Sequence, residues 1–513
     1  MSRKNGGIIG PANTPVGGLF KGVAGGVWRM NDVLNFVGNN QWPTGPKDIE
    51  NSCRFDDGSS DNLSLSVSGT SQSTTGTISF WFKRANISAD QRVFVNYIDA
   101  NNYGGIKLQS DDKLEIVVVD GGSVTGKLVT TQVFRDTSAW YHCVVAIDSS
   151  NGTAGDRMRL YINGSEVTSF DTDTNPSSSA TMEFFTDGTN RIGQFNSSQY
   201  FDGYLAEFVM IHGQQLTPSS FGETDSTTGI WKPKKIGQIA NAGDNSFYLD
   251  FKDSSSLGKD QSGLNNDFTV NNLTSIDQST DTCVNNAVTF TDIHPTASNF
   301  TISQGGLKIN KSGAGTFGLY GSSIMLSSGK WYWEVKFVAD AGSDRTRAGV
   351  AAYDSVTGTS SIQDDYSGFE FTCTTSGRFS FTEAGGSATE IDGFNSYSTG
   401  DIIMFALDMD NSKLYVGRNG DWFNYSSSAT GGDPTSGSGW VLNNTTILAA
   451  PQTIYAGHAV GVSGSSELQF NFGATNTFTV SSGNSDGNGY GNFEYAVPSG
   501  YYAINTKNLN TYG

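Results

Sequence analysis

The chain has 513 residues, which is too long for one compact core and predicts two or three domains. Only 16% of the residues are charged, whereas 12% are aromatic and 63 are Gly, a composition that excludes a disordered chain and favours short strands joined by tight turns. The net charge of −19, with 50 acidic and 31 basic residues, argues against direct binding to nucleic acid or to an anionic membrane.

The first 50 residues differ from the rest of the chain. They are rich in Gly and carry apolar side chains without a period long enough to build a core. Such a peptide either stays mobile or docks into another protein. In the docking case, the residues that we expect to make contact are Trp28, Met30, Leu34 and Phe36.

The segment from 51 to 222 carries strong strand signals. Within 77–83, Ile78, Phe80 and Phe82 alternate with Ser79 and Trp81, which predicts a strand with two different faces. Further strands are expected at 140–147, 160–162 and 201–211, and a short helical turn at 216–218. The second of these strands ends in an Asn-Gly pair at 163–164, which favours a type I′ hairpin.

Residues 223–290 are interpreted as a connector that carries one strand at 247–251. The turn from Asp260 to Asp267 is rich in the oxygen ligands that Ca²⁺ prefers. It lacks the ligand order and the closing Glu of an EF-hand loop, so an ordinary turn is expected there and no metal site is assigned.

A second strand-rich block spans 291–475. Trp331, Trp333, Val335 and Phe337 alternate with polar or amphipathic residues over 329–337. More strands are expected at 347–353, 377–381, 401–407, 414–416, 458–462 and 467–472, with another Asn-Gly turn at 419–420. The two blocks share one pattern: in each, an aromatic strand precedes an Asn-Gly hairpin by a similar number of residues. We therefore expect the same sandwich architecture in both blocks. Residues 476–513 are interpreted as a tail that packs on the second sandwich or on a neighbouring subunit.

Cysteine usage and the ends of the sequence restrict the class of protein. Cys53, Cys143, Cys283 and Cys373 form no CxxC pair, which excludes a disulfide-dense scaffold and a zinc ribbon. Four buried free thiols are expected, although the spacing leaves a single disulfide open. The opening residues show no secretory signal, and no stretch reaches the roughly 18 apolar residues that span a bilayer.

No catalytic constellation is found. The nearest approach to a glycosidase carboxylate pair is Glu390 with Asp392, but Asn395 stands where a further carboxylate would be needed. The chain has four His and no Gly-x-Ser-x-Gly elbow, P-loop or HExxH motif. We therefore expect a protein that is not an enzyme and that uses no cofactor.

Two resemblances rest on these strands. The runs at 79–83, 140–142, 160–164 and 203–208 resemble a laminin-G-like, concanavalin-type sandwich, and those at 329–335, 349–351 and 414–420 resemble a SPRY domain. The resemblances imply an all-β fold with two concanavalin-type antiparallel β-sandwiches (jelly rolls) in tandem after a short N-terminal docking segment. The expected division is 1–50, 51–222, 223–290, 291–475 and 476–513.

The order of these parts is similar to that of structural proteins of tailed bacteriophages. This resemblance implies a virion component, often a tail fibre or host-attachment protein, that is made in the host cytoplasm, docks to other virion proteins and binds a host surface glycan or receptor. Homo-oligomers are expected, with a trimer favoured for a fibre because several weak sugar sites then act together. The alternatives are a capsid-decorating or tail structural protein without a host ligand and, as a weaker one, a glycan depolymerase.

Glycan binding uses aromatic faces on rigid loops. The residues beside expected turns that fit this role are Tyr366, Phe394, Tyr397, Trp422 and Tyr425. SPRY domains bind partners through loops at one end of the sandwich, which is where these residues are expected to lie. For each of them, packing at the end of the core is the competing interpretation.

Overall fold

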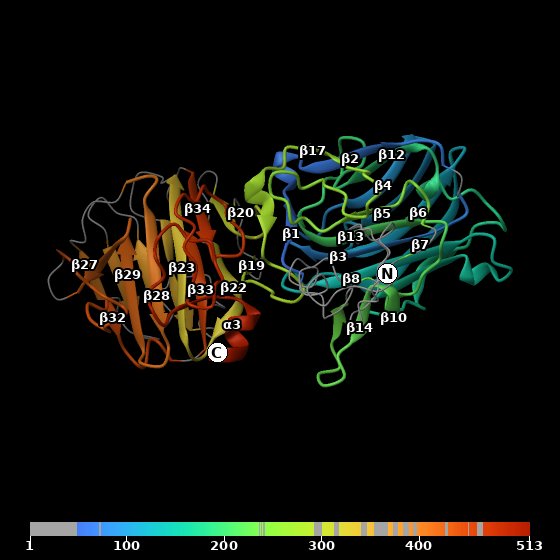
Figure 1. The fold of residues 1–513 in the computed structure, drawn as a ribbon. Helices are drawn as coiled ribbons and strands as arrows, with labels where there is room; N and C mark the ends of the chain where they lie inside the picture. The colour runs from blue at the N-terminus through green and yellow to red at the C-terminus, as the bar shows by residue number, and fades with distance from the viewer. Residues whose placement is uncertain are drawn as a thin grey trace, which may run out of the picture. The chain divides into compact units, whose positions relative to one another are not determined.

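The structure is a computed structural model in which two compact units are distinguished (Figure 1). Unit 1 comprises residues up to Gln278 together with Thr282–Val284, and unit 2 comprises Ser279–Asp281 and Asn285–Gly513. The described residues are 49–70, 73–234, 236, 239, 242–291, 300–311, 318–339, 346–352, 368–372, 378–382, 389–392, 398–425, 429–449, 451–458 and 465–513. Within them the regular structure is almost entirely strand, so the expected all-β class is confirmed.

Unit 1 is built from two antiparallel sheets. The first sheet has the order β10-β9-β8-β3-β13-β1-β18, with β16 beside β13, and the second has the order β11-β7-β6-β5-β4-β12-β2-β17. A separate hairpin joins β14 to β15. The strand bounds are β1 Ser52–Phe55, β2 Asn62–Val67, β3 Thr75–Arg84, β4 Gln91–Asp99, β5 Asn102–Leu108, β6 Lys113–Asp120, β7 Ser123–Val133, β8 Tyr141–Asp148, β9 Met158–Ile162, β10 Ser165–Glu166, β11 Phe170–Thr174, β12 Gly188–Ile192, β13 Gly203–His212, β14 Gly222–Thr224, β15 Trp231–Pro233, β16 Phe247–Leu249, β17 Thr269–Asn271 and β18 Gln278–Ser279.

The core of unit 1 follows from the alternation in β3 and β13. Ile78, Phe80 and Phe82 all point into the main core, where Phe80 stacks on Phe208 with ring centroids 5.1 Å apart. Trp81, on the opposite face of β3, packs in a separate small cluster. The two-faced strand predicted over 77–83 is therefore present, and both of its faces are buried.

The segment interpreted as a connector contributes to unit 1. β16 pairs with β13 and β17 pairs with β2, so residues 247–249 and 269–271 extend the two sheets of this unit. The strand expected at 247–251 is shorter than expected, because Phe251 adopts a positive φ of 54° that extended backbone cannot accommodate.

Two Asn-Gly turns join strands as expected. In unit 1, Asn163 and Gly164 have φ of 48° and 79° between β9 and β10. In unit 2, Asn419 and Gly420 have φ of 50° and 96° between β29 (Lys413–Arg418) and β30 (Asp421–Asn424). Left-handed backbone at both central positions is what a type I′ turn requires.

Unit 2 also contains two sheets. The first has the order β19-β22-β33-β24-β25-β26-β27, and the second has the order β20-β21-β34-β23-β28-β29-β30-β31, with β32 beside β29 and β35 beside β23. The bounds are β19 Phe290–Thr291, β20 Phe300–Ser303, β21 Lys308–Lys311, β22 Gly318–Leu326, β23 Lys330–Ala339, β24 Thr346–Ala352, β25 Gly368–Thr372, β26 Arg378–Thr382, β27 Thr389–Asp392, β28 Ile402–Asp408, β29 Lys413–Arg418, β30 Asp421–Asn424, β31 Ala429–Thr430, β32 Leu442–Asn443, β33 Gln452–His458, β34 Ser466–Asn471 and β35 Tyr502–Ala503. The strand expected at 458–462 lies outside the described residues after His458.

The core of unit 2 is formed by the alternating residues of β23. Trp331, Trp333, Val335 and Phe337 are all buried in it, and Trp333 stacks on Phe405 with centroids 5.1 Å apart and planes 2° from parallel. The other face of β23 carries Tyr332 in a second aromatic cluster. Both faces of this strand are therefore covered.

The C-terminal segment covers that second face. The Glu334 carboxylate, 0% exposed, accepts hydrogen bonds from Tyr332 Oη (2.9 Å), Asn471 Nδ2 (3.2 Å) and the backbone N–H groups of Glu494 (3.0 Å) and Tyr495 (2.8 Å). β35 pairs in parallel with β23. Helix α3 (Thr506–Tyr512) follows, capped by the Asn505 side chain, and was not predicted from the sequence.

The three cysteines that the structure describes form no disulfide, and one of them differs from expectation in its burial. Cys53 and Cys143 are buried, but Cys283 is only partly buried, because it lies in an irregular segment outside the sheets. The prediction of a fully buried thiol was therefore wrong for Cys283, while Cys373 lies outside the described residues.

Two buried His side chains predict a pH dependence for unit 1. His142 accepts a hydrogen bond from Trp231 Nε1 (3.1 Å) and contacts Ser79 Oγ through Nε2 (2.9 Å). Burial lowers the pKa of His142 to about 3 and that of His212 to about 4. Because the unfolded chain binds these protons near pH 6.5, each His contributes stability above that pH, and this stability is lost as the pH falls toward its folded-state pKa.

We expect His142→Gln to be less stable than the wild type at pH 7 and to lose this deficit on acidification. The difference in unfolding free energy should shrink by about 1.4 kcal/mol per pH unit below pH 6.5. Urea unfolding at several pH values measures it, and NMR should show no titration of the His142 ring above pH 5. A ring that titrates normally near pH 6.5 would contradict the prediction.

Candidate functional site

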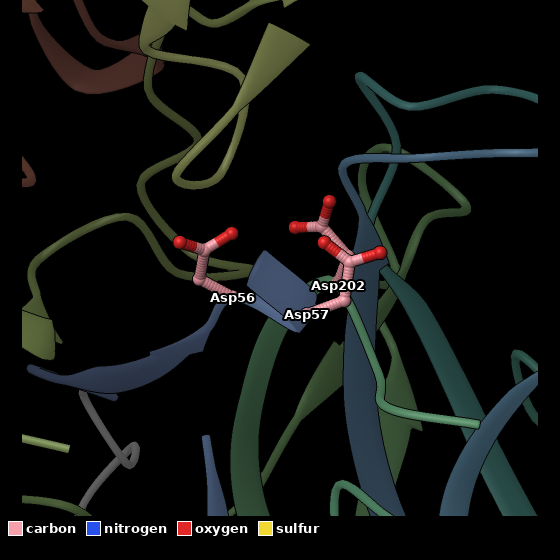
Figure 2. A group of neighbouring side chains, drawn as sticks. All are labelled: Asp56, Asp57 and Asp202. Carbon is pink, nitrogen blue, oxygen red and sulfur yellow. The ribbon is translucent and has the colours of Figure 1, made fainter. Parts of the chain in front are cut away.

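Three aspartates from two distant segments of unit 1 lie close together, as Figure 2 shows. Asp56 and Asp57 follow β1, and Asp202 precedes β13. One carboxylate oxygen from each lies within 4.8 Å of those of the other two. Asp202 is 1% exposed and Asp56 is 7% exposed, whereas Asp57 is open to solvent. We call this group the aspartate cluster.

The pairing of β1 with β13 brings the aspartate cluster together. The register places Phe55 opposite Gly203, so the residues that flank these two positions become neighbours. Gly203 has φ of 149°, and a Cβ there would lie 2.2 Å from the carbonyl oxygen of Lys83, so only glycine fits. Phe201 packs edge-on against Phe55 at 6.2 Å. The two segments are thereby fixed relative to each other.

The hydrogen bonding of the aspartate cluster is incomplete. Oδ2 of Asp56 accepts from Ser59 Oγ (3.1 Å), but Oδ1 of Asp56 and Oδ1 of Asp202 are buried without a hydrogen-bond partner. Burial, and then the charges of Asp57 and Asp56, raise the pKa of Asp202 well above its ordinary value. Burial and the charge of Asp277 raise the pKa of Asp61 nearby to about 7. Burial and the neighbouring carboxylates therefore both favour the protonated form of Asp202.

A basic residue beside the aspartate cluster is already engaged. Arg54 Nη2 donates to Asp277 Oδ1 at 2.7 Å, and both side chains are buried. The Arg54 charge lowers the pKa values of Asp202 and Asp61, but it is outweighed by burial and by the neighbouring aspartates.

The Asp260–Asp267 turn is internally satisfied. The Asp260 carboxylate accepts hydrogen bonds from the N–H groups of Tyr248, Ser262 and Asn266 and from Ser262 Oγ, at 2.6–2.9 Å. Asp267 accepts from Lys259 Nζ at 2.7 Å and from the N–H of Asp260 at 2.9 Å. Protein donors therefore occupy the oxygens that a calcium ion would need, which favours the ordinary turn.

An aromatic pair on unit 2 joins an exposed Tyr to a partly buried Trp. Tyr425, directly after β30, is 41% exposed and stacks on Trp440 with centroids 5.8 Å apart and planes 18° from parallel. Trp422, within β30, contacts Tyr332 edge-on at 6.3 Å and belongs to the aromatic cluster on the sheet. Of Tyr425 and Trp422, only Tyr425 is exposed.

The remaining residues proposed for binding are not placed by the structure. Tyr366, Phe394 and Tyr397, and the docking residues Trp28, Met30, Leu34 and Phe36, lie outside the described residues.

Sequence reasoning missed Trp440 and all three members of the aspartate cluster. A signal for the latter was present, since Phe55-Asp56 and Phe201-Asp202 both open a Phe-Asp run that ends in Gly at 58 and at 203. The pairing of the two runs is a long-range contact, which no local pattern reveals.

In the part of the chain that the structure describes, no helix is long and apolar enough to cross a membrane.

Comparisons with known proteins bear mainly on unit 1. Residues 57–220 match a family model described as Concanavalin A-like lectin/glucanases superfamily (Laminin_G_3). No curated protein matches the sequence.

Three solved structures are similar to parts of the chain. The SPRY domain of human HERC1 is 16% identical and covers 37% of this chain and 99% of its own, with a TM-score of 0.27. The heptameric SAP-like pentraxin from Limulus polyphemus is 18% identical, with coverage of 39% and 96% and a TM-score of 0.26. Domains LG4-5 of the mouse laminin alpha1 chain are 10% identical, with coverage of 80% and 84% and a TM-score of 0.27. With the family match over 57–220 and the two antiparallel sheets of unit 1, the chain carries a concanavalin A-like domain of the laminin G type.

Proposed function

We propose that this chain is a non-enzymatic binding protein of a bacteriophage particle, a tail fibre or other host-attachment protein that recognises a cell-surface glycan or protein. The observation that carries the binding role is the exposed Tyr425 ring, which stacks on the partly buried Trp440. The phage assignment rests on the order of domains in the sequence.

The aromatic pair has the properties of a sugar-binding platform. Tyr425 directly follows β30, which pairs with both β29 and β31, so paired strands support the backbone beside this residue. A rigid aromatic ring offers apolar area at low entropic cost. The nearby Asp433–Ser438 turn adds no free polar groups, because its Asp433 carboxylate and its Ser436 and Ser438 hydroxyls bond within the turn. The support for a glycan ligand is therefore the exposed Tyr425 ring.

Catalysis by the aspartate cluster is disfavoured by burial. Glycoside hydrolysis needs two carboxyl groups about 5–9.5 Å apart that flank an accessible bond. Asp56 and Asp202 are buried, so Asp57 is the one member of this cluster that a substrate could reach. Purified protein incubated with host surface polysaccharide should leave the polysaccharide chain length unchanged, and depolymerisation would contradict the non-enzymatic role.

We expect Tyr425→Ala to weaken binding to host cells by about 30-fold, the effect of truncating an aromatic hot spot worth roughly 2 kcal/mol. Fluorescently labelled protein measures binding, and the wild-type protein should compete with phage adsorption. Ile230→Ala is the matched control, because it truncates an apolar side chain that is 65% exposed on unit 1.

A capsid-decorating or tail structural role without a host ligand is the alternative. It would be favoured if the wild-type protein failed to bind host cells and if many copies covered the head of the particle. If the wild type and Tyr425→Ala bound host cells equally well, the attachment role would stand, but the binding surface would lie elsewhere.

A further inference from the structure

Arg92, on β4 of unit 1, is a buried arginine with incomplete hydrogen bonding. It is 3% exposed, and its Nη2 donates to Gln199 Oε1 at 3.1 Å. Its Nε and Nη1 are buried without a hydrogen-bond partner among the described residues. Burial lowers the pKa of Arg92, but a guanidinium keeps its charge at neutral pH. Unit 1 therefore leaves two N–H groups of a buried cation unsatisfied, which is costly unless a ligand accepts from them.

The lysines beside Arg92 have carboxylate partners, whereas Arg92 has none. Arg92 lies opposite Lys107 on β5, and Lys107 lies opposite Glu115 on β6, so the three share the face of the sheet that points away from the main core. Lys107 and Lys127 both pair with Glu115, at 3.8 and 2.8 Å. In the described part of the chain, no carboxylate oxygen lies within 4.0 Å of the Arg92 guanidinium.

The Arg92 head group lies in a slot between a strand glycine and two aromatic rings. A Cβ at Gly105 would lie 2.5 Å from Nη1, so a larger residue there would have to push the guanidinium aside. Arg92 Cζ lies 4.8 Å from the ring centroid of Phe195 and 6.0 Å from that of Tyr103. These contacts hold the head group in place without using its N–H groups.

Gln199 occupies the nitrogen that a bidentate ligand needs. A guanidinium presents two forks to a carboxylate, Nε with Nη2 and Nη1 with Nη2, so Nη2 belongs to both. The amide oxygen of Gln199 is a weaker acceptor than a carboxylate oxygen, and this side chain is only half-buried, so it can rotate into solvent. A carboxylate that replaces the amide oxygen at Nη2 gains a second hydrogen bond at Nε or Nη1.

We propose that Arg92 binds a carboxylate group on unit 1 and that the Gln199 side chain closes this site until the ligand displaces it. The carboxylate accepts two hydrogen bonds from one fork of the guanidinium and neutralises its buried charge. The half-buried rings of Tyr103 and Phe195 border the site and pack against the rest of the ligand. A free organic acid and an acidic sugar share this chemistry. The site does not involve the Tyr425 ring on unit 2, so it stands or falls separately from the proposed function.

Calorimetry of the full chain tests the carboxylate and distinguishes its sources. Sodium acetate and sodium glucuronate are titrated at one fixed ionic strength, because exposed charges are screened by salt. Both should bind saturably, and glucose and sodium chloride should not. Tighter binding of glucuronate than of acetate would identify an acidic sugar as the ligand, and equal affinities would identify a free acid. No saturable binding of either carboxylate would overturn the proposal.

Three variants test whether the carboxylate binds at Arg92. Arg92→Met should abolish glucuronate binding and melt no lower than the wild type, because it replaces a buried charge by an apolar side chain. Gln199→Ala should bind glucuronate about five-fold more tightly, the contribution of one neutral hydrogen bond. The matched control is Arg159→Met, which removes an arginine already paired with Asp156 and Glu166 at 2.6 and 3.3 Å and should bind like the wild type. Glucuronate binding retained in Arg92→Met would overturn the site, and unchanged affinity in Gln199→Ala would overturn the role of Gln199.

Discussion

Replacement of Glu334 by Ala should destabilise unit 2 by about 4 kcal/mol and release its C-terminal segment. The change leaves Asn471, the Tyr332 hydroxyl and two backbone N–H groups without their acceptor, and each buried unsatisfied group costs about 1–3 kcal/mol. Urea unfolding measures the stability, and hydrogen exchange should show faster exchange at the amides of Glu494 and Tyr495.

A milder substitution distinguishes the effect of losing a hydrogen bond from a general disruption of the core. Tyr332→Phe removes one donor to the same carboxylate and should cost about 1 kcal/mol without faster exchange at residues 494–495. If Glu334→Ala and Tyr332→Phe had equal effects, the carboxylate would not be what holds the C-terminal segment.

Replacement of Asp112 by Ala should destabilise unit 1 by about 4–6 kcal/mol. The Asp112 carboxylate accepts from Arg84 Nη1 (2.9 Å), Arg135 Nε (2.8 Å) and the N–H of Ser88 (2.7 Å), and Arg84 is 0% exposed. Removing one partner of a buried ion pair costs about 3–5 kcal/mol, and Ala at the Asp112 φ of 68° adds about 1 kcal/mol of strain. Chemical unfolding followed by a unit 1 probe measures the loss.

We expect this loss of stability because the Arg84 charge would remain buried without the Asp112 carboxylate. Burial lowers the pKa of Arg84, and hydrogen bonding to Asp112 opposes that shift. Asp112→Asn tolerates the left-handed backbone, so it should retain part of the stability that Ala loses. The double variant Arg84→Met/Asp112→Ala should be less destabilised than the sum of the single variants. Additive effects would show that the pair is not coupled.

The sequence predicted the strands whose pattern is local and strong. The two-faced strands around Phe80 and Trp333 are present, as are the hairpins at Asn163 and Asn419, because side-chain alternation and positive φ are properties of neighbouring residues. The strands β4 to β7 were missed. Which residues of these strands are buried depends on the strands they pair with and not on a local alternation. In β7, for example, a buried stretch lies between two exposed ends.

The candidate sites were less predictable than the strands. Asp56 and Asp202 are 146 positions apart and meet only because β1 pairs with β13, which no local pattern specifies. Tyr425 was singled out by its place after a turn, but its partner Trp440 comes from a separate loop. The oxygen-rich turn at Asp260 looked like a metal loop in composition, yet backbone N–H groups engage its oxygens.

The parallel pairing of β35 with β23 has a consequence for biosynthesis. Trp331 and Tyr332 contact residues 502 and 503 in this register, so unit 2 gains that strand only after some 170 further residues have been translated. The last residue of unit 1 is Val284, and translation proceeds at about 5–20 residues per second. Unit 1 therefore has about ten seconds or more to fold on the ribosome, and during this time the aromatic face of β23 lacks the C-terminal residues that cover it.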